Sequence, residues 1–310
     1  MPIRIRHVLC PIDFSDASRR ALDYAVMLAR WYRARLSVLH IHQLAMPVYG
    51  VSQSGLESLQ PVLLTDLEHR QLLDRLDAEV AADRSATDLA IETLLDEAVR
   101  VPDAILGHAR STSADVIVMG THGRSGFERL VLGSMAEKVL RKASCPVLTV
   151  PPRAADAVPR DIASIHRILC PTDFSPSSGR ALEYAASLAQ EAHARLTVLH
   201  VLELAPDLSE YPYAGLAAEY RDARFQQARA HLSKAVAAVV PATCPVEELV
   251  LVGKSYREIL RVGADQAADL IAMGVQGRGA VDLMFFGSTA NHVVRQATCP
   301  VLTLKGETPR

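Results

Sequence analysis

Two glycine-rich stretches have the composition of loops that hold a phosphate group. MGTHGRSGFERLVLGS covers residues 119–134 at the end of the apolar run DVIVM, and MGVQGRGAVDLMFFGS covers residues 273–288 at the end of DLIAM. Glycine has no Cβ, so main-chain N–H groups in such loops can approach an anion closely and can adopt positive φ. Neither stretch has the Gly-Lys-Ser/Thr ending of a P-loop. We therefore expect a phosphate cradle of another kind, present twice.

The two loops share one spacing of glycines and serine. In each, a Gly-x-x-Gly pair is followed after nine residues by Gly-Ser at a predicted helix start, where free N–H groups and the helix dipole favour an anion. The serine hydroxyl could donate to a phosphate oxygen or cap the helix. The shared positions are Gly120, Gly123, Gly133 and Ser134 in the first loop and Gly274, Gly277, Gly287 and Ser288 in the second. Arg124 and Arg278 could add charge at the phosphate, or be solvated. The alternative for each loop is a plain strand–helix turn.

The whole chain contains two copies of one sequence pattern. HVLCPIDFSDASRRALDYAVMLA begins at His7, and RILCPTDFSPSSGRALEYAASLA begins at Arg167. ARLSVLHI recurs as ARLTVLHV, and KASCPVLTV recurs as QATCPVLTL. Such a repeat predicts two copies of one domain, over residues 1–150 and 165–310. The segment between them, residues 151–164, is rich in proline, alanine and charge, and we interpret it as a linker.

Within each copy, strands alternate with helices. In the first copy the expected strands are IRHVLCPI, RLSVLHI, AIETLL, DVIVMG and PVLTV. The helices are one capped by Ser15 or Asp16, one near 65–84, one near 102–113 and one near 134–143. This alternation predicts a parallel sheet with helices on both faces. We therefore expect two tandem α/β domains of the Rossmann-like, doubly wound type, each with a five-stranded parallel sheet.

Two aspartates mark the edge of the sheet where ligands bind in such folds. Asp13 and Asp173 directly follow the first strand of each copy, and ligands bind off the carboxyl ends of the strands. A carboxylate would not face phosphates, but it could accept a hydrogen bond from a ribose hydroxyl or an exocyclic amino group. Main-chain groups near Ile41 and Val201, at the ends of the second strands, could read a base edge. Together with the glycine loops, these residues indicate a nucleotide site. The alternative is that each aspartate only caps the first helix.

Other polar and aromatic residues have simpler interpretations. His40 and His200 close the second strands, and we interpret them as packed or hydrogen-bonded histidines rather than ligands. The first copy is longer in its middle, which predicts surface loops near residues 44–65 and 205–220. The tyrosine-rich segment 211–220 is expected to be a surface loop, with a flap over the second site as the alternative.

Composition narrows the class of protein. The chain has 310 residues, 49% hydrophobic and 22% charged, with a formal net charge of −2, which gives no global electrostatic reason to bind nucleic acid or an anionic membrane. We find no apolar run long enough to span a membrane and no leader pattern at the N-terminus, so we expect a cytoplasmic protein. The five cysteines form no CxxC pair, and we expect packed thiols rather than disulfides or catalysts.

These motifs resemble those of the universal stress protein family. The resemblance rests on Asp13, on the Gly-x-x-Gly-(nine residues)-Gly-Ser loop and on the terminal CPVLTV strand, and it extends over both halves. It implies a strand order of 3-2-1-4-5 and a site for ATP or another adenine nucleotide. It implies ligand contacts at Asp13, Ile41, Gly120, Gly123, Gly133 and Ser134, with Asp173, Val201, Gly274, Gly277, Gly287 and Ser288 as counterparts. It also implies that the last strands, PVLTV and PVLTL, pair edge to edge, so that one chain forms an intramolecular pseudo-dimer. Association of two such chains stays open.

The sequence favours a nucleotide-binding regulatory protein of the stress response over an efficient enzyme. Hydrolysis of ATP would need a positioned water or base and a carboxylate for Mg²⁺. The phosphate-side loops offer Glu128 and Asp282, which could approach a hydrated Mg²⁺ or simply be solvated. Slow ATP hydrolysis therefore stays an alternative, as do ATP-dependent nucleotidyl transfer and an interaction scaffold with vestigial sites.

Overall fold

The computed structural model describes residues 3–44, 51–52, 55–56, 63–82, 88–121, 132–152, 165–203, 214–275 and 286–306. The first half contains β1 (His7–Pro11), α1 (Asp16–Tyr32), β2 (Arg35–Gln43), β3 (Val51–Ser52), β4 (Gly55–Leu56), α2 (Asp66–Ala81), β5 (Ile91–Ala98), α3 (Val101–Ser111), β6 (Val116–Gly120), α4 (Ser134–Lys142) and β7 (Val147–Val150). The second half contains β8 (Arg167–Pro171), α5 (Pro176–Ala192), β9 (Arg195–Leu202), α6 (Ala214–Val239), β10 (Val246–Val252), α7 (Ser255–Asp265), β11 (Leu270–Gly274), α8 (Ser288–Gln296) and β12 (Val301–Leu304).

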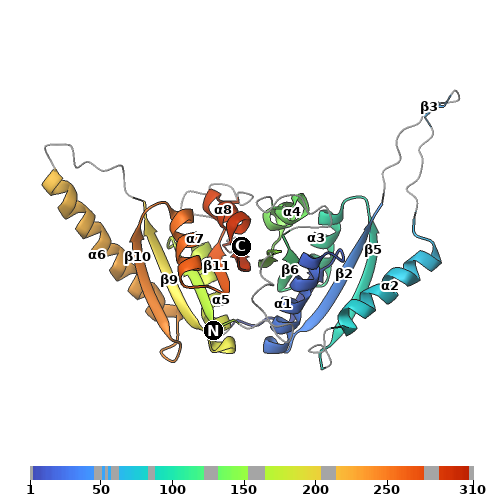
Figure 1. Ribbon diagram of the computed structural model, residues 1–310, viewed down its shortest axis with the longest axis horizontal. Coiled ribbons are helices and arrows are strands. Elements are labelled where there is room, and N and C mark those ends of the chain that lie inside the picture. Colours follow the sequence, from blue (N-terminus) through green and yellow to red (C-terminus); the bar gives the residue numbers. More distant parts are fainter. Residues whose placement is uncertain are drawn as a thin grey trace.

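The two halves form a single ten-stranded sheet (Figure 1). Its order is β10-β9-β8-β11-β12-β7-β6-β1-β2-β5, so each half has the order 3-2-1-4-5. Strands within each half are parallel, whereas β12 pairs antiparallel with β7 through Val301–Thr149, Leu302–Leu148 and Thr303–Val147. Both the strand order and the edge pairing of the last strands are therefore confirmed. The pairing also removes two open sheet edges, which would otherwise be free to associate with other chains.

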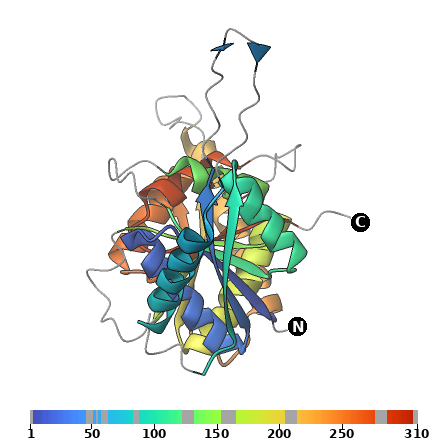
Figure 2. The same ribbon diagram turned by 90° about the vertical axis from the view of Figure 1, so that its right-hand side faces the viewer.

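Helices cover both faces of the sheet, as Figure 2 shows for the first half. The apolar side chains of α1, α2, α5 and α6 belong to one buried cluster, and those of α3, α4, α7 and α8 belong to a second cluster. Each cluster includes residues of both halves. The inner parallel strands β1, β6, β8 and β11 are buried from both sides, which explains their apolar runs, whereas the edge strands β5 and β10 are only partly buried.

Local signals set the helix ends. Ser15 is the N-cap of α1 and accepts from the Ser18 N–H, and the helix ends at Arg33 in the left-handed conformation. The alternative cap, Asp16, is the first residue of the helix. A capping box of Thr65 and Glu68 starts α2. The expectation of a loop over 211–220 is wrong for its second part, because α6 already begins at Ala214.

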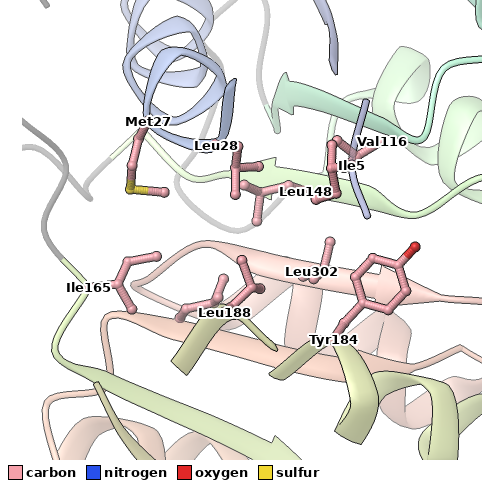
Figure 3. Close-up of a pocket in the computed structure, with 10 residues that line it drawn as sticks. Ile5, Met27, Leu28, Val116, Leu148, Ile165, Tyr184, Leu188 and Leu302 are labelled. Carbon is pink, nitrogen blue, oxygen red and sulfur yellow. The ribbon is translucent and has the colours of Figure 1, made fainter. Parts of the chain in front are cut away.

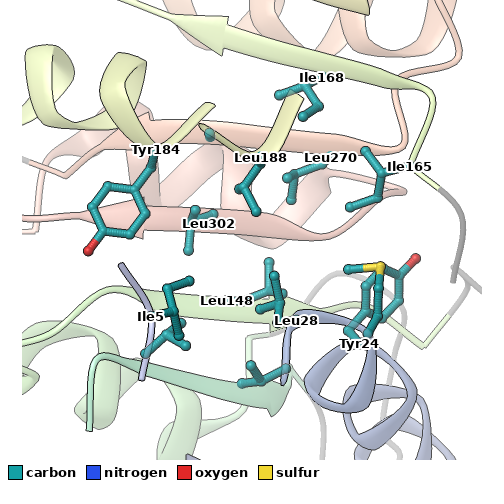
Figure 4. Packing of buried hydrophobic residues seen from close by; sticks show 14 of the residues in the cluster. Ile5, Tyr24, Leu28, Leu148, Ile165, Ile168, Tyr184, Leu188, Leu270 and Leu302 are labelled. Atoms are coloured by element: carbon teal, nitrogen blue, oxygen red, sulfur yellow. The ribbon is translucent and has the colours of Figure 1, made fainter. Parts of the chain in front are cut away.

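The two halves meet along the β7–β12 seam in apolar contact. Figures 3 and 4 show Leu28 and Leu148 of the first half facing Leu188 and Leu302 of the second. A cavity of about 10 Å³ lies between these side chains. A cavity of that size holds at most about one water molecule. The seam is therefore a packed core with a small defect, and it offers no room for a ligand.

Polar contacts cross the seam on both faces of the sheet. On one face the Tyr32 hydroxyl of α1 lies 2.9 Å from Ser187 Oγ of α5. On the other face the Arg295 guanidinium of α8 donates to Glu137 of α4 at 3.0 Å. Lys305 Nζ, which follows β12, donates to the Arg141 carbonyl at the end of α4 at 2.7 Å. The two domains are therefore joined by side chains from helices as well as by strands.

Within the described part of the chain, no helix is both long enough and apolar enough to cross a bilayer. All five cysteines are free thiols, and the expectation of packed thiols is confirmed for Cys10, Cys170 and Cys244, which are buried, whereas Cys145 and Cys299 are partly buried. Burial raises the pKa of the Cys170 thiol to about 12 and that of Cys145 to about 11. Neither thiol is a ready nucleophile at neutral pH, because the thiolate is the reactive form.

Candidate functional site

In each half, the first and fourth strands separate as they approach their carboxyl ends. β1 and β6 pair at Val8–Val116 and Leu9–Ile117, although β1 continues to Pro11 and β6 to Gly120. The same two-pair contact joins β8 and β11 in the second half. The separation falls between the first and fourth strands, where the strand order reverses. This is the position at which open α/β sheets bind their ligands.

Asp13 stands directly after β1 and supports the start of α1. Its Oδ1 accepts from the Ser15 N–H at 3.1 Å and from the Ser15 hydroxyl at 2.6 Å. Ser15 in turn caps α1 by accepting from the Ser18 N–H at 3.2 Å. Asp173 and Ser175 repeat these contacts at 3.0 and 2.6 Å. The aspartates therefore do not cap the helices themselves, but they hold the capping serines, which fixes each carboxylate at the sheet edge.

The residue after each aspartate has an unusual backbone conformation. Phe14 has a φ of 63° and Phe174 has a φ of 62°, backbone values that few residues other than glycine adopt. The Phe14 ring lies 4.5 Å from the His40 ring, and His40 Nδ1 lies 2.8 Å from the Ile12 carbonyl oxygen. These two contacts of His40 support the turn between β1 and α1, and they confirm that His40 is a packed, hydrogen-bonded histidine.

His200 plays the same part in the second half. Its Nδ1 lies 2.7 Å from the Thr172 carbonyl oxygen, and its ring lies 4.4 Å from the Phe174 ring. The side chain that packs against the phenylalanine ring differs between the halves. Arg75 of α2 places its guanidinium carbon 4.0 Å from the centre of the Phe14 ring, whereas His231 of α6 meets Phe174 edge-on at 5.9 Å.

Sequence reasoning missed Phe14 and Phe174, and it also missed the side chains that pack on their rings. The positive φ of Phe14 has no signal in its residue type, because glycine or asparagine would be expected there. Arg75 and His231 reach this position from α2 and α6, which are distant in sequence from Phe14 and Phe174. These contacts are a property of tertiary packing and are not encoded in a local motif.

Ile41 and Val201 are placed so that their main-chain groups face the reversal point. In β2 the odd-numbered residues bond to β1, as the contacts of Arg35 with Arg6 and of Ile12 with Leu39 show. Ile41 is the next odd-numbered residue after Leu39, where β1 has ended, so its N–H and C=O point beyond the end of β1. Val201 has the same position relative to β8. Their side chains are buried or half-buried.

Gly120 and Gly274 have a different structural role from the one expected. Among the described glycines, positive φ occurs at Gly253 and at neither of these two. A Cβ on Gly120 would lie 2.9 Å from the main-chain carbon of Ala17, and one on Gly274 would lie 2.5 Å from Ser177 Oγ. The expectation of positive φ is therefore wrong at these positions. Glycine is needed there because the strand end packs directly on the first turn of α1 or α5.

The far ends of both glycine loops are tied to the sheet. The Gly133 N–H donates to the Thr121 carbonyl at 2.9 Å, and the Gly287 N–H donates to the Val275 carbonyl at 2.8 Å. Gly133 and Gly287 are the N-caps of α4 and α8, and no side chain caps either helix. Ser134 and Ser288 are the first helical residues, so the cap alternative for these serines is wrong. Within the described part of the chain, both helices therefore begin with N–H groups that no N-cap side chain satisfies.

Ten of the predicted site residues are thus brought to the carboxyl edge of their own half, five in each. They are Asp13, Ile41, Gly120, Gly133 and Ser134, and Asp173, Val201, Gly274, Gly287 and Ser288. Gly123, Arg124, Gly277 and Arg278 lie outside the described residues, as do the candidate Mg²⁺ carboxylates Glu128 and Asp282. Among the residues that are described, no cluster of three or more His, Cys, Asp or Glu side chains could hold a metal ion.

Comparisons with known proteins give one family for both halves. The model of the universal stress protein family matches residues 4–151 and again residues 164–305. A universal stress protein of Thermus aquaticus is 37% identical over 139 residues, which cover 44% of this chain and 97% of the relative. One from Synechocystis is 25% identical over 315 residues, covering 97% of this chain and all of the relative. The crystal structure of a universal stress protein from Archaeoglobus fulgidus has a TM-score of 0.62 at 21% identity, covering 98% of this chain and 97% of that chain. The last comparison shows the shared fold.

Proposed function

This chain belongs to the universal stress protein family, and we propose that each of its two domains binds one adenine nucleotide, ATP in the first place. Binding at the two sites would make the chain a nucleotide-responsive regulatory protein of the stress response. We also propose residues 1–150 and 165–310 as the two nucleotide-binding units, with residues 151–164 as the linker. Catalysis is no part of this proposal.

The observation that carries the proposal is the pair of uncapped helix starts at the reversal points. Among the described residues, no N-cap side chain accepts from the first N–H groups of α4 and α8, and the positive end of the helix dipole favours an anion there. A phosphate at Ser134 or Ser288 would satisfy these donors. The Gly133–Thr121 hydrogen bond fixes the helix start relative to the end of β6, which supports a preformed position for the anion.

The other end of the nucleotide would meet the aspartate. Asp13 is held by two hydrogen bonds from Ser15, and a fixed carboxylate is a suitable acceptor for a ribose hydroxyl or an amino group. The main-chain groups of Ile41 face the same region, where a base edge could pair with them. Arg124 and Arg278 are proposed as additional phosphate contacts, together with Gly123 and Gly277. Mg²⁺ would be bound through the phosphates rather than by a protein cluster.

The test is to place a carboxylate at the proposed phosphate position. Ser134→Glu adds a negative charge to the first helical position, where the dipole favours it, so the variant should fold. Two like charges about 4 Å apart repel by about 4 kcal/mol at an effective dielectric of 20, so affinity at the first site should fall by a factor of about 100 or more. Ser134→Gln is the matched neutral control. Ser288→Glu and Ser288→Gln repeat the pair in the second half.

Isothermal titration with ATP should give two sites for the native chain and one site for either single glutamate variant. The double variant Ser134→Glu/Ser288→Glu should show no site. The glutamine variants should stay within a few-fold of the native affinity. Absence of ATP binding at millimolar concentration, or equal binding by the glutamate variants, would refute the proposal and favour a scaffold. Release of phosphate, or of pyrophosphate with AMP, measured in the same samples would instead support hydrolysis or nucleotidyl transfer.

A further inference from the structure

Arginines gather at the amino-terminal edge of the first half, at the opposite end of the strands from the candidate site. All are exposed, and they come from four neighbouring elements. The Arg35 N–H donates to the Arg6 carbonyl at 2.9 Å, which places the residues just before β1 beside the start of β2. The set, called here the arginine edge, consists of Arg4 and Arg6 before β1, Arg30 and Arg33 at the end of α1, Arg35 at the start of β2, and Arg110 at the end of α3.

The arginine edge has little charge compensation from the described part of the chain. No described carboxylate lies within salt-bridge distance of these six guanidinium groups. The nearby Asp115 carboxylate is occupied by main-chain N–H groups, accepting from Arg6 at 2.7 Å and from His7 at 3.0 Å. Asp88 and Glu92 stand near the start of β5. Positive charge therefore exceeds negative charge at this end of the domain.

The second half serves as an internal control for what the fold requires. Where α1 ends in Arg30-Trp31-Tyr32-Arg33, α5 ends in Gln190-Glu191-Ala192-His193. Both helices terminate in the same way, with C-caps at φ of 51° and 53°. The counterparts of Arg6 and Arg110 are His166 and Ala264. Cations stabilise helix C-termini, but α5 and α7 have none in their last turns and form nevertheless. The arginines therefore exceed what the fold needs.

We propose that the arginine edge binds the phosphate backbone of single-stranded nucleic acid. Arginine contacts phosphate oxygens in fork geometry. Trp31, between Arg30 and Arg33, packs against the core but is only partly buried, and its accessible part could stack on a base. The net charge of −2 does not report this patch, because opposite charges elsewhere in the chain cancel it. The site is separate from the proposed nucleotide sites and does not depend on them.

A linear polyanion fits this surface better than a membrane does. In Figure 1, β2 and β9 both start at the lower side of the molecule, so the corresponding edge of the second half faces the same way. That edge exposes Glu191, Glu247 and Glu248 as well as Arg167 and Arg195, so a flat anionic bilayer would approach carboxylates together with the arginines. A single strand can contact the first half alone. None of the exposed large aliphatic side chains among the described residues lies at the arginine edge, so no membrane anchor is present there.

The experiment uses the full chain and a fluorescein-labelled oligonucleotide of about 20 nucleotides, a length that covers one or more sites of this kind. Four contacts to phosphate give a log–log salt slope of about −3 for single strands, so affinity should fall about 50-fold between 50 and 200 mM KCl. The test variant Arg6→His/Arg30→Gln/Arg33→His/Arg110→Ala takes its residues from the second half, where the same fold carries them. Its slope should fall to about −1, and its affinity at 50 mM KCl should drop at least tenfold.

The matched control removes four exposed arginines elsewhere, as Arg70→Gln/Arg224→Gln/Arg229→Gln/Arg257→Gln, with the same change in net charge. It should bind the oligonucleotide within about twofold of the native chain. Equal loss in control and test variants would overturn the proposal, because the effect would then be one of total charge. Binding to phosphatidylserine vesicles or polyglutamate without binding to the oligonucleotide would overturn it as well, as would no binding of the oligonucleotide at 50 mM KCl.

Discussion

Replacing Gly274 by alanine tests the close contact that brings β11 onto α5. The added Cβ would lie 2.5 Å from Ser177 Oγ and 2.7 Å from both the Ser177 main-chain carbon and the Ser178 nitrogen. Ordinary contacts are about 3.5–4.0 Å, so the shortfall is about 1 Å against main-chain atoms. The hydroxyl can rotate away, but the main chain of this turn is held by the Ser175 cap.

Overpacking of this kind costs about 1–3 kcal/mol. Since two main-chain atoms must move, we expect Gly274→Ala to reduce the free energy of unfolding by about 3 kcal/mol. Gly120→Ala meets Ala17 atoms at 2.9–3.1 Å and should cost less, about 1–2 kcal/mol. Two controls are available, because a Cβ on Gly107 of α3 or Gly179 of α5 meets nothing within 4 Å.

Urea unfolding followed by far-UV circular dichroism gives the four free energies. Gly107→Ala and Gly179→Ala should be stabilising by about 0.5–1 kcal/mol, because alanine loses less entropy than glycine in a helix. The reasoning fails if Gly274→Ala unfolds within about 0.5 kcal/mol of the native chain, the usual range for harmless substitutions. It also fails if Gly120→Ala costs more than Gly274→Ala.

Two further substitutions probe the core and its pH response. Leu302→Ala at the seam, where Leu302 is 3% exposed, should lower the free energy of unfolding by about 2–4 kcal/mol, and a loss under about 1 kcal/mol in urea titrations would contradict the packed seam. Burial, above all, and the Arg35 charge lower the pKa of His7 below 6.5, although the Thr112 carbonyl, Asp115 and Glu92 oppose them. The unfolded chain therefore binds the proton more readily, so the stability that the neutral imidazole contributes is complete above about pH 6.5 and is lost as pH falls through and below that value. His7→Gln should show a smaller loss of stability between pH 7.5 and 5.5, and an unchanged loss would remove His7 as the cause.

Much of the fold could be predicted because the repeat and the strand patterns are local features. DVIVM and PVLTV are short apolar runs between helical stretches, and the structure has them as β6 and β7. Ser15 was one of two expected caps, and the structure selects it. The start of α6 was missed, because 211–220 contains tyrosines and a proline that suggest a loop, while the helix extends to Ala214.

The site was only partly predictable, since some of its residues act through packing. The positions of Asp13 and Gly133 follow from their places at the end of a strand and the start of a helix. The reason for glycine at position 120 does not, because the nearest atoms belong to Ala17 on a helix more than a hundred residues earlier. From the sequence, we explained this glycine by its backbone freedom and by access for an anion. In the structure, glycine is required at position 120 because α1 packs directly on the end of β6.

The duplicated site also argues for unequal properties of its two copies. Both halves retain the aspartate, the capping serine, the phenylalanine at positive φ and the histidine that bonds the preceding carbonyl. They differ in the side chain over the phenylalanine, which is Arg75 in one half and His231 in the other. Arg75 lies over the face of the Phe14 ring, whereas His231 meets the Phe174 ring edge-on. These two side chains pack on the residue next to the aspartate that is proposed to meet the nucleotide, so the surroundings of the two sites differ at this position. The shared contacts thus fix the shape of both sites, and the covering residues are where the two sites can differ.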